Sequence, residues 1–162
     1  MSEGSESRVQ RSFRRSSRRP IRESGVLADW MGLLTILLEE DLSSVRLYGG
    51  PGARMLTRVA GAAALTLGHS IYCSSSTWAA LEAGRLRALE LVAHEAVHVV
   101  QIRRSGLARF LGRYVAEYLK MRLRGRDHRS AYLLLSAEVE ARRYADLCTR
   151  VLARHAVLGV SP

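Results

Sequence analysis

Two histidines and a glutamate stand in the pattern His94-Glu95-Ala96-Val97-His98, with the histidines four positions apart. On an α-helix, residues four apart lie on one face, one turn from each other, so the two imidazoles can bind a single metal ion. A glutamate directly after the first histidine can take a proton from a water that the metal acidifies. This HExxH pattern is typical of zinc metallopeptidases. It predicts zinc-dependent hydrolysis, with His94 and His98 as ligands and Glu95 as general base.

The pattern lies in a segment, residues 86–103, that contains neither Gly nor Pro. Apolar residues recur there at spacings of three or four, which predicts a helix with one face towards the core: Leu86, Leu89, Ala93, Val97 and Val100. A short motif also arises by chance, and the alternative interpretation is two ordinary helix histidines beside a solvated glutamate. The helical setting favours the metal site.

A third metal ligand has to come from elsewhere, because a catalytic zinc ion takes about three protein ligands and keeps one position for water. The candidates after the motif are His128, Glu138, Glu140, Asp146 and His155. Glu138 and Glu140 fall two apart in a predicted helix, about 200° around its axis, so only one of them can face the metal. Spacing alone leaves the choice between them open.

The rest of the sequence predicts one mainly helical domain. Helices are predicted at residues 25–40, 53–62, 107–123 and from Ser130 or Ala131 to about His155, with a turn or short helix at 78–84 after a serine-rich loop at 74–77. Strands are predicted at residues 45–48, 63–67 and 70–73, and Gly68-His69 has the length of a two-residue hairpin turn. The expected fold class is α+β, mainly α-helical, with a small antiparallel β-sheet next to the HExxH helix.

The first 24 residues differ in composition from the rest of the chain. They contain seven Arg, three Glu and seven Ser, a net charge of 7 − 3 = +4, and few apolar residues. Such a segment cannot bury enough apolar surface to offset its ordering entropy. We therefore predict a disordered Arg/Ser-rich tail at residues 1–24 and a folded domain at residues 25–158. Cys73 and Cys148 form no disulfide framework and are expected to be small buried residues of a reduced protein.

The net charge of +10 is weak evidence for nucleic-acid binding. Arginine supplies all the basic residues except Lys120, as is typical of GC-rich bacterial genomes, and no zinc finger or helix-turn-helix pattern accompanies them. No specific nucleic-acid partner is predicted. The apolar stretch at residues 26–38 is too short to span a bilayer, and residues 1–24 lack the apolar core of a signal peptide. The expected location is the cytoplasm of the producing bacterium, and the sequence leaves the oligomeric state open.

Residues 41–146 resemble a known family, the extracellular contractile injection system (eCIS) core domain. The resemblance rests on four segments in order: residues 41–48 as an opening strand, residues 62–72 as a hairpin, residues 91–101 as the motif helix, and the Glu-Val-Glu-Ala element at 138–141. The chain departs from the family at Tyr48, where a histidine is common, and at Ile102, where a second glutamine is common. Neither departure removes a predicted ligand.

The resemblance implies a zincin-like metallopeptidase fold in which a distant glutamate completes the zinc site. By position in the late element, Glu138 is the implied third ligand, in preference to Glu140. The implied partners are a peptide or protein substrate and contractile injection system components. The resemblance also implies export through such an injection system, a route that needs no signal peptide. The implied function is peptide-bond hydrolysis, as an effector or processing factor. The alternative is a non-catalytic, zinc-stabilised structural or adaptor protein of such a system.

The sequence leaves two assignments open: the oxyanion donor and the role of Gln101. Peptide hydrolysis needs a donor that stabilises the developing oxyanion, and the candidates are Tyr114, Tyr132, His69 and His128. Gln101 follows the motif by three positions on the same predicted helix. It is interpreted either as a residue that orients a metal ligand or caps the helix, or as an ordinary surface residue.

Overall fold

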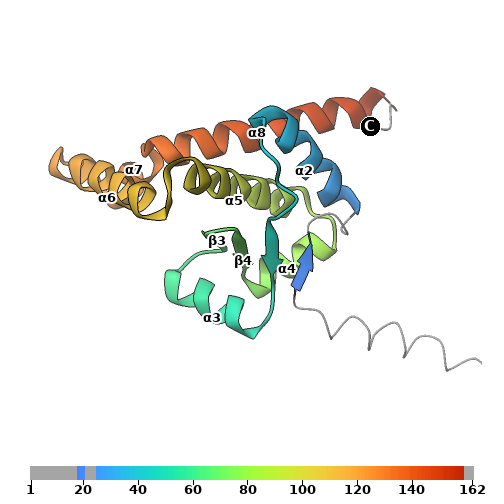
Figure 1. Ribbon diagram of the computed structural model, residues 1–162, viewed down its shortest axis with the longest axis horizontal. Coiled ribbons are helices and arrows are strands. Elements are labelled where there is room, and N and C mark those ends of the chain that lie inside the picture. The colour runs from blue at the N-terminus through green and yellow to red at the C-terminus, as the bar shows by residue number, and fades with distance from the viewer. Residues whose placement is uncertain (1–17, 21–24, 159–162) are drawn as a thin grey trace, which may run out of the picture.

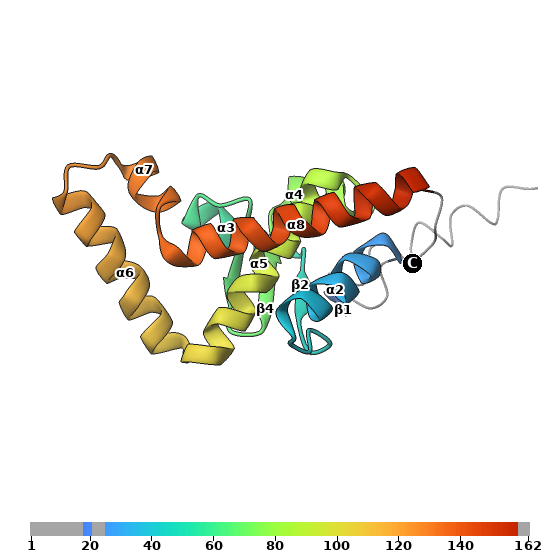
Figure 2. The ribbon, with the colours of Figure 1, turned by 90° about the horizontal axis from the view of Figure 1, so that it is seen from above.

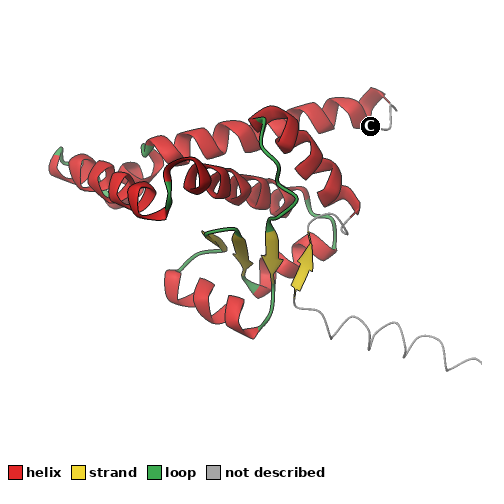
Figure 3. Cartoon of the chain, in the orientation of Figure 1, coloured by secondary structure: helices red, strands yellow, loops and turns green. Residues whose placement is uncertain are grey.

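The computed structural model describes residues 18–20 and 25–158, which form a mainly helical molecule with one small sheet (Figure 1). The helices are α2 (Gly25–Leu38), α3 (Pro51–Ala60), α4 (Ser75–Glu82), α5 (Leu86–Ser105), α6 (Leu107–Leu123), α7 (His128–Leu133) and α8 (Ser136–Leu158). The strands are β1 (Arg18–Pro20), β2 (Arg46–Tyr48), β3 (Ala64–Leu67) and β4 (Ser70–Cys73). Figure 3 shows that the strands lie together on one side of the helical layer. The predicted α+β class, mainly helical, is confirmed.

Helix α5 lies at the centre of the core. It contacts α8 and α2 on one side and strands β3 and β4 on the other, and Figure 1 shows α5 and α8 running side by side above the sheet. Because it is covered on both sides, more than the predicted stripe is buried: Val92, Ala96 and Val99 are as buried as Ala93 and Val97. Leu86, predicted to face the core, is instead exposed at the first turn. The helix ends where Gly106 adopts a φ of 78°.

The sheet is mixed, so the prediction of an antiparallel sheet is wrong in part. Strands β3 and β4 form the predicted antiparallel hairpin, with Leu67 opposite Ser70 across the Gly68-His69 turn. Strand β2, however, pairs in parallel with β4. The chain leaves β2, crosses over through α3, runs up β3 and returns along β4, which reverses direction twice and makes β2 and β4 parallel. The order β1-β2-β4-β3 leaves β3 at an edge.

The last predicted helix is two helices. Helix α7 begins after Asp127, whose carboxylate accepts a hydrogen bond from the Ser130 backbone N–H at 3.0 Å. Helix α7 ends at Leu133, and α8 begins at Ser136. The Glu117 carboxylate on α6 accepts hydrogen bonds from the Ser136 backbone N–H at 2.8 Å and from its hydroxyl at 2.7 Å. This contact satisfies an N–H that the first turn of a helix leaves unpaired, and it fixes where α8 begins. Figure 2 shows α6 turning away from the end of α5, and α7 leading from the far end of α6 back to the start of α8.

The structure also bears on the predictions for the start of the chain, for the two cysteines and for membrane-spanning helices. Residues 18–20 form β1, which pairs antiparallel with β2, so the prediction of disorder for residues 1–24 is wrong for these three. Residues 1–17 and 21–24, the rest of that predicted tail, lie outside the described residues. Cys73 and Cys148 are free and buried, as expected, and burial raises the pKa of each thiol to about 12. Within the described part of the chain, no helix is long and apolar enough to span a bilayer.

Candidate metal centre

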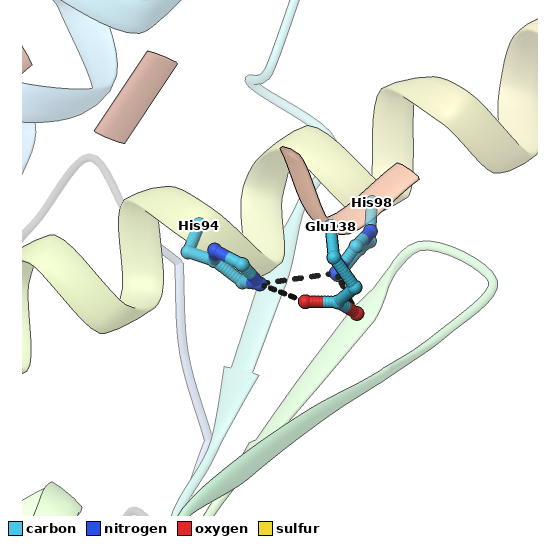
Figure 4. Close-up of side chains that lie close together, drawn as sticks. All are labelled: His94, His98 and Glu138. Atoms are coloured by element: carbon cyan, nitrogen blue, oxygen red, sulfur yellow. Dashed lines mark hydrogen bonds and ion pairs between the residues drawn. The ribbon is translucent and has the colours of Figure 1, made fainter. Parts of the chain in front are cut away.

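Three side chains from two helices converge where α5 meets α8 (Figure 4). His94 and His98 lie one turn apart on α5, and Glu138 lies in the first turn of α8. Nε2 of His94 is 3.2 Å from Nε2 of His98 and 3.2 Å from Oε2 of Glu138. Nε2 of His98 is 3.3 Å from Oε1 of Glu138. The three side chains predicted as zinc ligands therefore meet in one cluster, the His-His-Glu cluster, with their ligand atoms within 4.8 Å of one another.

One atom of the cluster tests whether a metal ion fits there. Oε2 of Glu138 is buried and receives no hydrogen bond from the described residues; Nε2 of His94 lies 3.2 Å from it and Nη1 of Arg142 lies 3.9 Å from it. A buried carboxylate oxygen without a donor is costly unless a positive charge compensates it, and the Arg142 guanidinium lies beyond hydrogen-bonding distance. Two imidazole nitrogens and one carboxylate are also the donor set of His₂Glu catalytic zinc sites. The residues present thus fit a zinc ion, which would contact this oxygen directly.

The electrostatics of the cluster favour an ionised carboxylate. Burial alone would raise the pKa of Glu138, but the adjacent imidazoles of His94 and His98 hold it well below its usual range. Burial likewise lowers the pKa of His98, yet hydrogen bonding to Glu138 and the charge of Glu95 raise it overall. The Tyr114 hydroxyl donates a hydrogen bond to Oε1 of Glu138 at 2.8 Å. Burial and the Glu138 charge raise the pKa of Tyr114, so this phenol stays protonated as a donor.

Glu95 lies beside the cluster but is not part of it. Its side chain points from α5 towards the edge strand β3, where the Thr66 hydroxyl lies 2.8 Å from Oε2 and 2.9 Å from the Glu95 backbone carbonyl oxygen. The hydroxyl carries a single hydrogen, which both acceptors share. Glu95 is 7% exposed, and it lines the two pockets that open on either side of the cluster. The carboxylate is therefore held in place and can reach a molecule bound in either pocket.

The other candidates for the third ligand lie apart from the cluster. Glu140 accepts a hydrogen bond from Gln101 at 2.8 Å, Asp146 pairs with Arg150 at 2.6 Å, and His128 lies 2.8 Å from the Tyr118 hydroxyl. The side chain of His155 lies outside the described residues. Of the candidates whose side chains are described, Glu138 is the one that meets both histidines.

A cleft passes over the His-His-Glu cluster. One pocket extends towards α7 and α8, and a second lies between β3 and α6; both are lined by Ala62, Ala64, Glu95, Tyr132 and Glu138. The second pocket is largely apolar, with Leu65, Ile102, Phe110 and Leu111 in its wall. Residues 64–66 of the edge strand β3 follow the cleft. Within the described residues, β3 pairs with β4 alone, so its other edge has no strand partner.

The four candidates for an oxyanion donor differ in their placement. Tyr132 lines both pockets and is 39% exposed. Tyr114 lines only the apolar pocket and donates its hydroxyl to Glu138, while His128 lines only the other pocket. His69 lies in the hairpin turn and lines neither. Tyr132 is therefore the candidate that the geometry favours.

Two contacts of the cluster could not be read from the sequence. Thr66 is an ordinary β-branched residue of a strand, and its contact with Glu95 depends on how β3 packs against α5. Tyr114 reaches Glu138 because α6 passes the first turn of α8, where Glu117 of α6 also binds Ser136. Gln101, which the sequence left between two roles, contacts His98 through its side-chain oxygen, 2.7 Å from Nδ1.

Part of the chain matches a known protein family. Residues 33–106 match the model of the eCIS core domain, which is 106 − 33 + 1 = 74 of 162 residues. The matched segment runs from α2 to the end of α5 and contains His94, Glu95 and His98, whereas Glu138 lies beyond it. No curated protein and no solved structure matches the chain.

Proposed function

We propose, from the eCIS core match and the His-His-Glu cluster, that this protein is a zinc-dependent peptidase associated with a contractile injection system. The observation that carries the proposal is the convergence of two imidazole nitrogens on the buried carboxylate of Glu138, whose Oε2 receives no hydrogen bond. A cation bound there would stabilise that arrangement, since the Arg142 guanidinium lies 3.9 Å from the oxygen, beyond hydrogen-bonding distance. The family match supports the association with an injection system and says nothing of the reaction.

His94, His98 and Glu138 would hold the zinc ion. When bound, zinc supplies a Lewis acid that acidifies water and polarises a carbonyl. Glu95 lies beside the cluster and its carboxylate is held by Thr66. It would take the proton of the attacking water and return it to the leaving nitrogen, as a general acid–base residue does.

The cleft supports a peptide as substrate. An extended peptide can add to the free edge of β3 through backbone hydrogen bonds, which recognise any sequence. The apolar pocket between β3 and α6 would accept an apolar side chain next to the scissile bond. Such a peptide would lie across Glu95 and the cluster.

Zinc removal tests the proposal. The purified full chain is expected to contain about one zinc ion per molecule and to cleave members of an unstructured peptide library. A chelator should abolish this cleavage, and added zinc should restore it. Elemental analysis measures the zinc content, and mass spectrometry of the products measures cleavage. A chain that binds zinc and cleaves nothing would instead be a zinc-stabilised structural or adaptor domain, and a chain that binds no zinc would contradict both functions.

Thr66→Val is expected to lower kcat roughly tenfold, the equivalent of about 1.4 kcal/mol, because Val keeps the shape of the strand residue but cannot hold the Glu95 carboxylate. Zinc content should not change, since Thr66 does not contact the cluster. Steady-state kinetics and metal analysis measure these effects. Thr77→Val is the matched control, because the Thr77 hydroxyl bonds the Ala63 carbonyl oxygen and not Glu95. Equal losses in both variants would mean that the effect is a general loosening of the hairpin.

A further inference from the structure

Gln101 connects a cluster histidine on α5 to the start of α8. Its side-chain oxygen lies 2.7 Å from Nδ1 of His98. Its side-chain nitrogen lies 3.0 Å from the Ala137 backbone carbonyl oxygen and 2.8 Å from Oε2 of Glu140. The Glu140 carboxylate thus reaches His98 through one intervening amide.

The chemistry of these neighbours determines how the amide is oriented. The Ala137 carbonyl and the Glu140 carboxylate are both acceptors, so the group between them must be the NH₂ of Gln101. The opposite end, facing His98, is then the carbonyl oxygen, which can only accept. Nδ1 of His98 must therefore carry a hydrogen. In the neutral imidazole the lone pair then lies on Nε2, the nitrogen that faces His94 and Glu138.

We propose that Gln101 is a positioning residue that holds His98 in the Nδ1–H tautomer, and that Glu140 fixes the Gln101 amide for this purpose. The proposal deepens the proposed function, since it rests on His98 as a zinc ligand. It also assigns separate roles to the two glutamates of the 138–141 element: Glu138 faces the cluster directly, whereas Glu140 acts on it through Gln101. Hydrogen-bond partners of this kind orient metal-binding histidines and increase their basicity.

His94 provides an internal comparison. Its ring contacts His98 and Glu138 through Nε2, and none of the described residues forms a hydrogen bond with its Nδ1. Only one of the two histidines is therefore fixed by the protein in the absence of a ligand. A change at Gln101 should act directly on His98 and reach His94 only through the contact between the two Nε2 atoms.

Gln101→Leu tests the proposal in the full chain. The variant keeps the bulk of the side chain but loses the hydrogen bond to His98, and we expect zinc affinity to fall about 10- to 100-fold. In the metal-free protein at alkaline pH, nitrogen NMR of the imidazoles should show His98 as the Nδ1–H tautomer in the unchanged chain. The same measurement should show a mixture of His98 tautomers in Gln101→Leu.

The double variant Gln101→Glu/Glu140→Leu separates orientation of His98 from simple cross-linking of α5 to α8. The new carboxylate at position 101 still accepts from His98 Nδ1–H. It has no donor at position 140, and the bond to Ala137 is lost, so the cross-link is removed. If Gln101 acts by orienting His98, this double variant binds zinc nearly as tightly as the unchanged chain. If Gln101 is only a cross-link, the double variant binds zinc as poorly as Gln101→Leu.

The outcomes distinguish this proposal from the proposed function. An unchanged zinc affinity or an unchanged His98 tautomer in Gln101→Leu would overturn the role of Gln101, even if the chain proves to be a zinc peptidase. A chain that binds no zinc would overturn the proposed function, while the tautomer measurement on metal-free protein would still decide how Gln101 acts on His98. Circular dichroism and thermal unfolding establish that each variant is folded.

Discussion

Glu95→Gln is expected to lower kcat by roughly 10²–10⁴-fold, the usual contribution of a general base, while leaving the zinc content unchanged. The amide has nearly the same shape as the carboxylate and can still accept the hydrogen bond from Thr66, so the fold around β3 is preserved. It cannot take a proton from the attacking water. Because Glu95 lies outside the His-His-Glu cluster, all three predicted ligands are retained and zinc should still bind.

Glu90→Gln is the matched control for this change. Glu90 lies on the same helix and lines the same cleft next to His94, but it does not line the second pocket. It is the nearest rival carboxylate on α5. Its variant should keep kcat close to that of the unchanged chain. A large loss in Glu90→Gln with little loss in Glu95→Gln would move the general base to position 90.

Glu138→Gln is expected to weaken zinc binding more than about 100-fold, beyond the effect of losing a residue that merely orients a ligand. The amide keeps the volume of the side chain in its buried position, but it removes the negative charge that faces both imidazoles. Isothermal titration with zinc measures the loss. Cleavage should fall with zinc occupancy and recover only at high zinc concentration.

Glu140→Gln is the counterpart of this variant, since it makes the same chemical change two residues along α8. The amide oxygen at position 140 can still accept from Gln101, so zinc affinity should change little. The pair of variants decides directly between the two glutamates that the sequence offers as third ligand. Loss of zinc in Glu140→Gln and retention in Glu138→Gln would assign the site the other way round.

The parts of the site that follow from local sequence could be predicted. The spacing of His94 and His98 determines that both lie on one helical face, and residues 86–103, free of Gly and Pro, made the helix itself predictable. The hairpin around Gly68-His69 could be predicted in the same way, because neighbouring residues determine its turn. Glu138 was selected over Glu140 by resemblance to a family, and the structure places it against both histidines.

What could not be predicted depends on contacts between distant segments. The break between α7 and α8 is fixed by Glu117, a residue of another helix, acting on Ser136. The parallel pairing of β2 with β4 depends on how α3 crosses over, which no alternation pattern within a strand reveals. The same holds for Thr66, because its sequence environment is that of any strand residue, and only packing against α5 brings it to Glu95.

Strand β3 lies at the edge of the described sheet and presents its backbone along the cleft, and backbone hydrogen bonds to such an edge do not depend on a chain end. For the proposed peptidase, a substrate would therefore bind through an internal stretch, and no free amino or carboxyl end would be required. To lie along β3, that stretch must first be drawn out as an extended strand. How readily a folded target is cleaved would then depend on the free energy of local unfolding of its loops as much as on their sequence. Compact proteins would resist cleavage, and partly unfolded chains would be cut first.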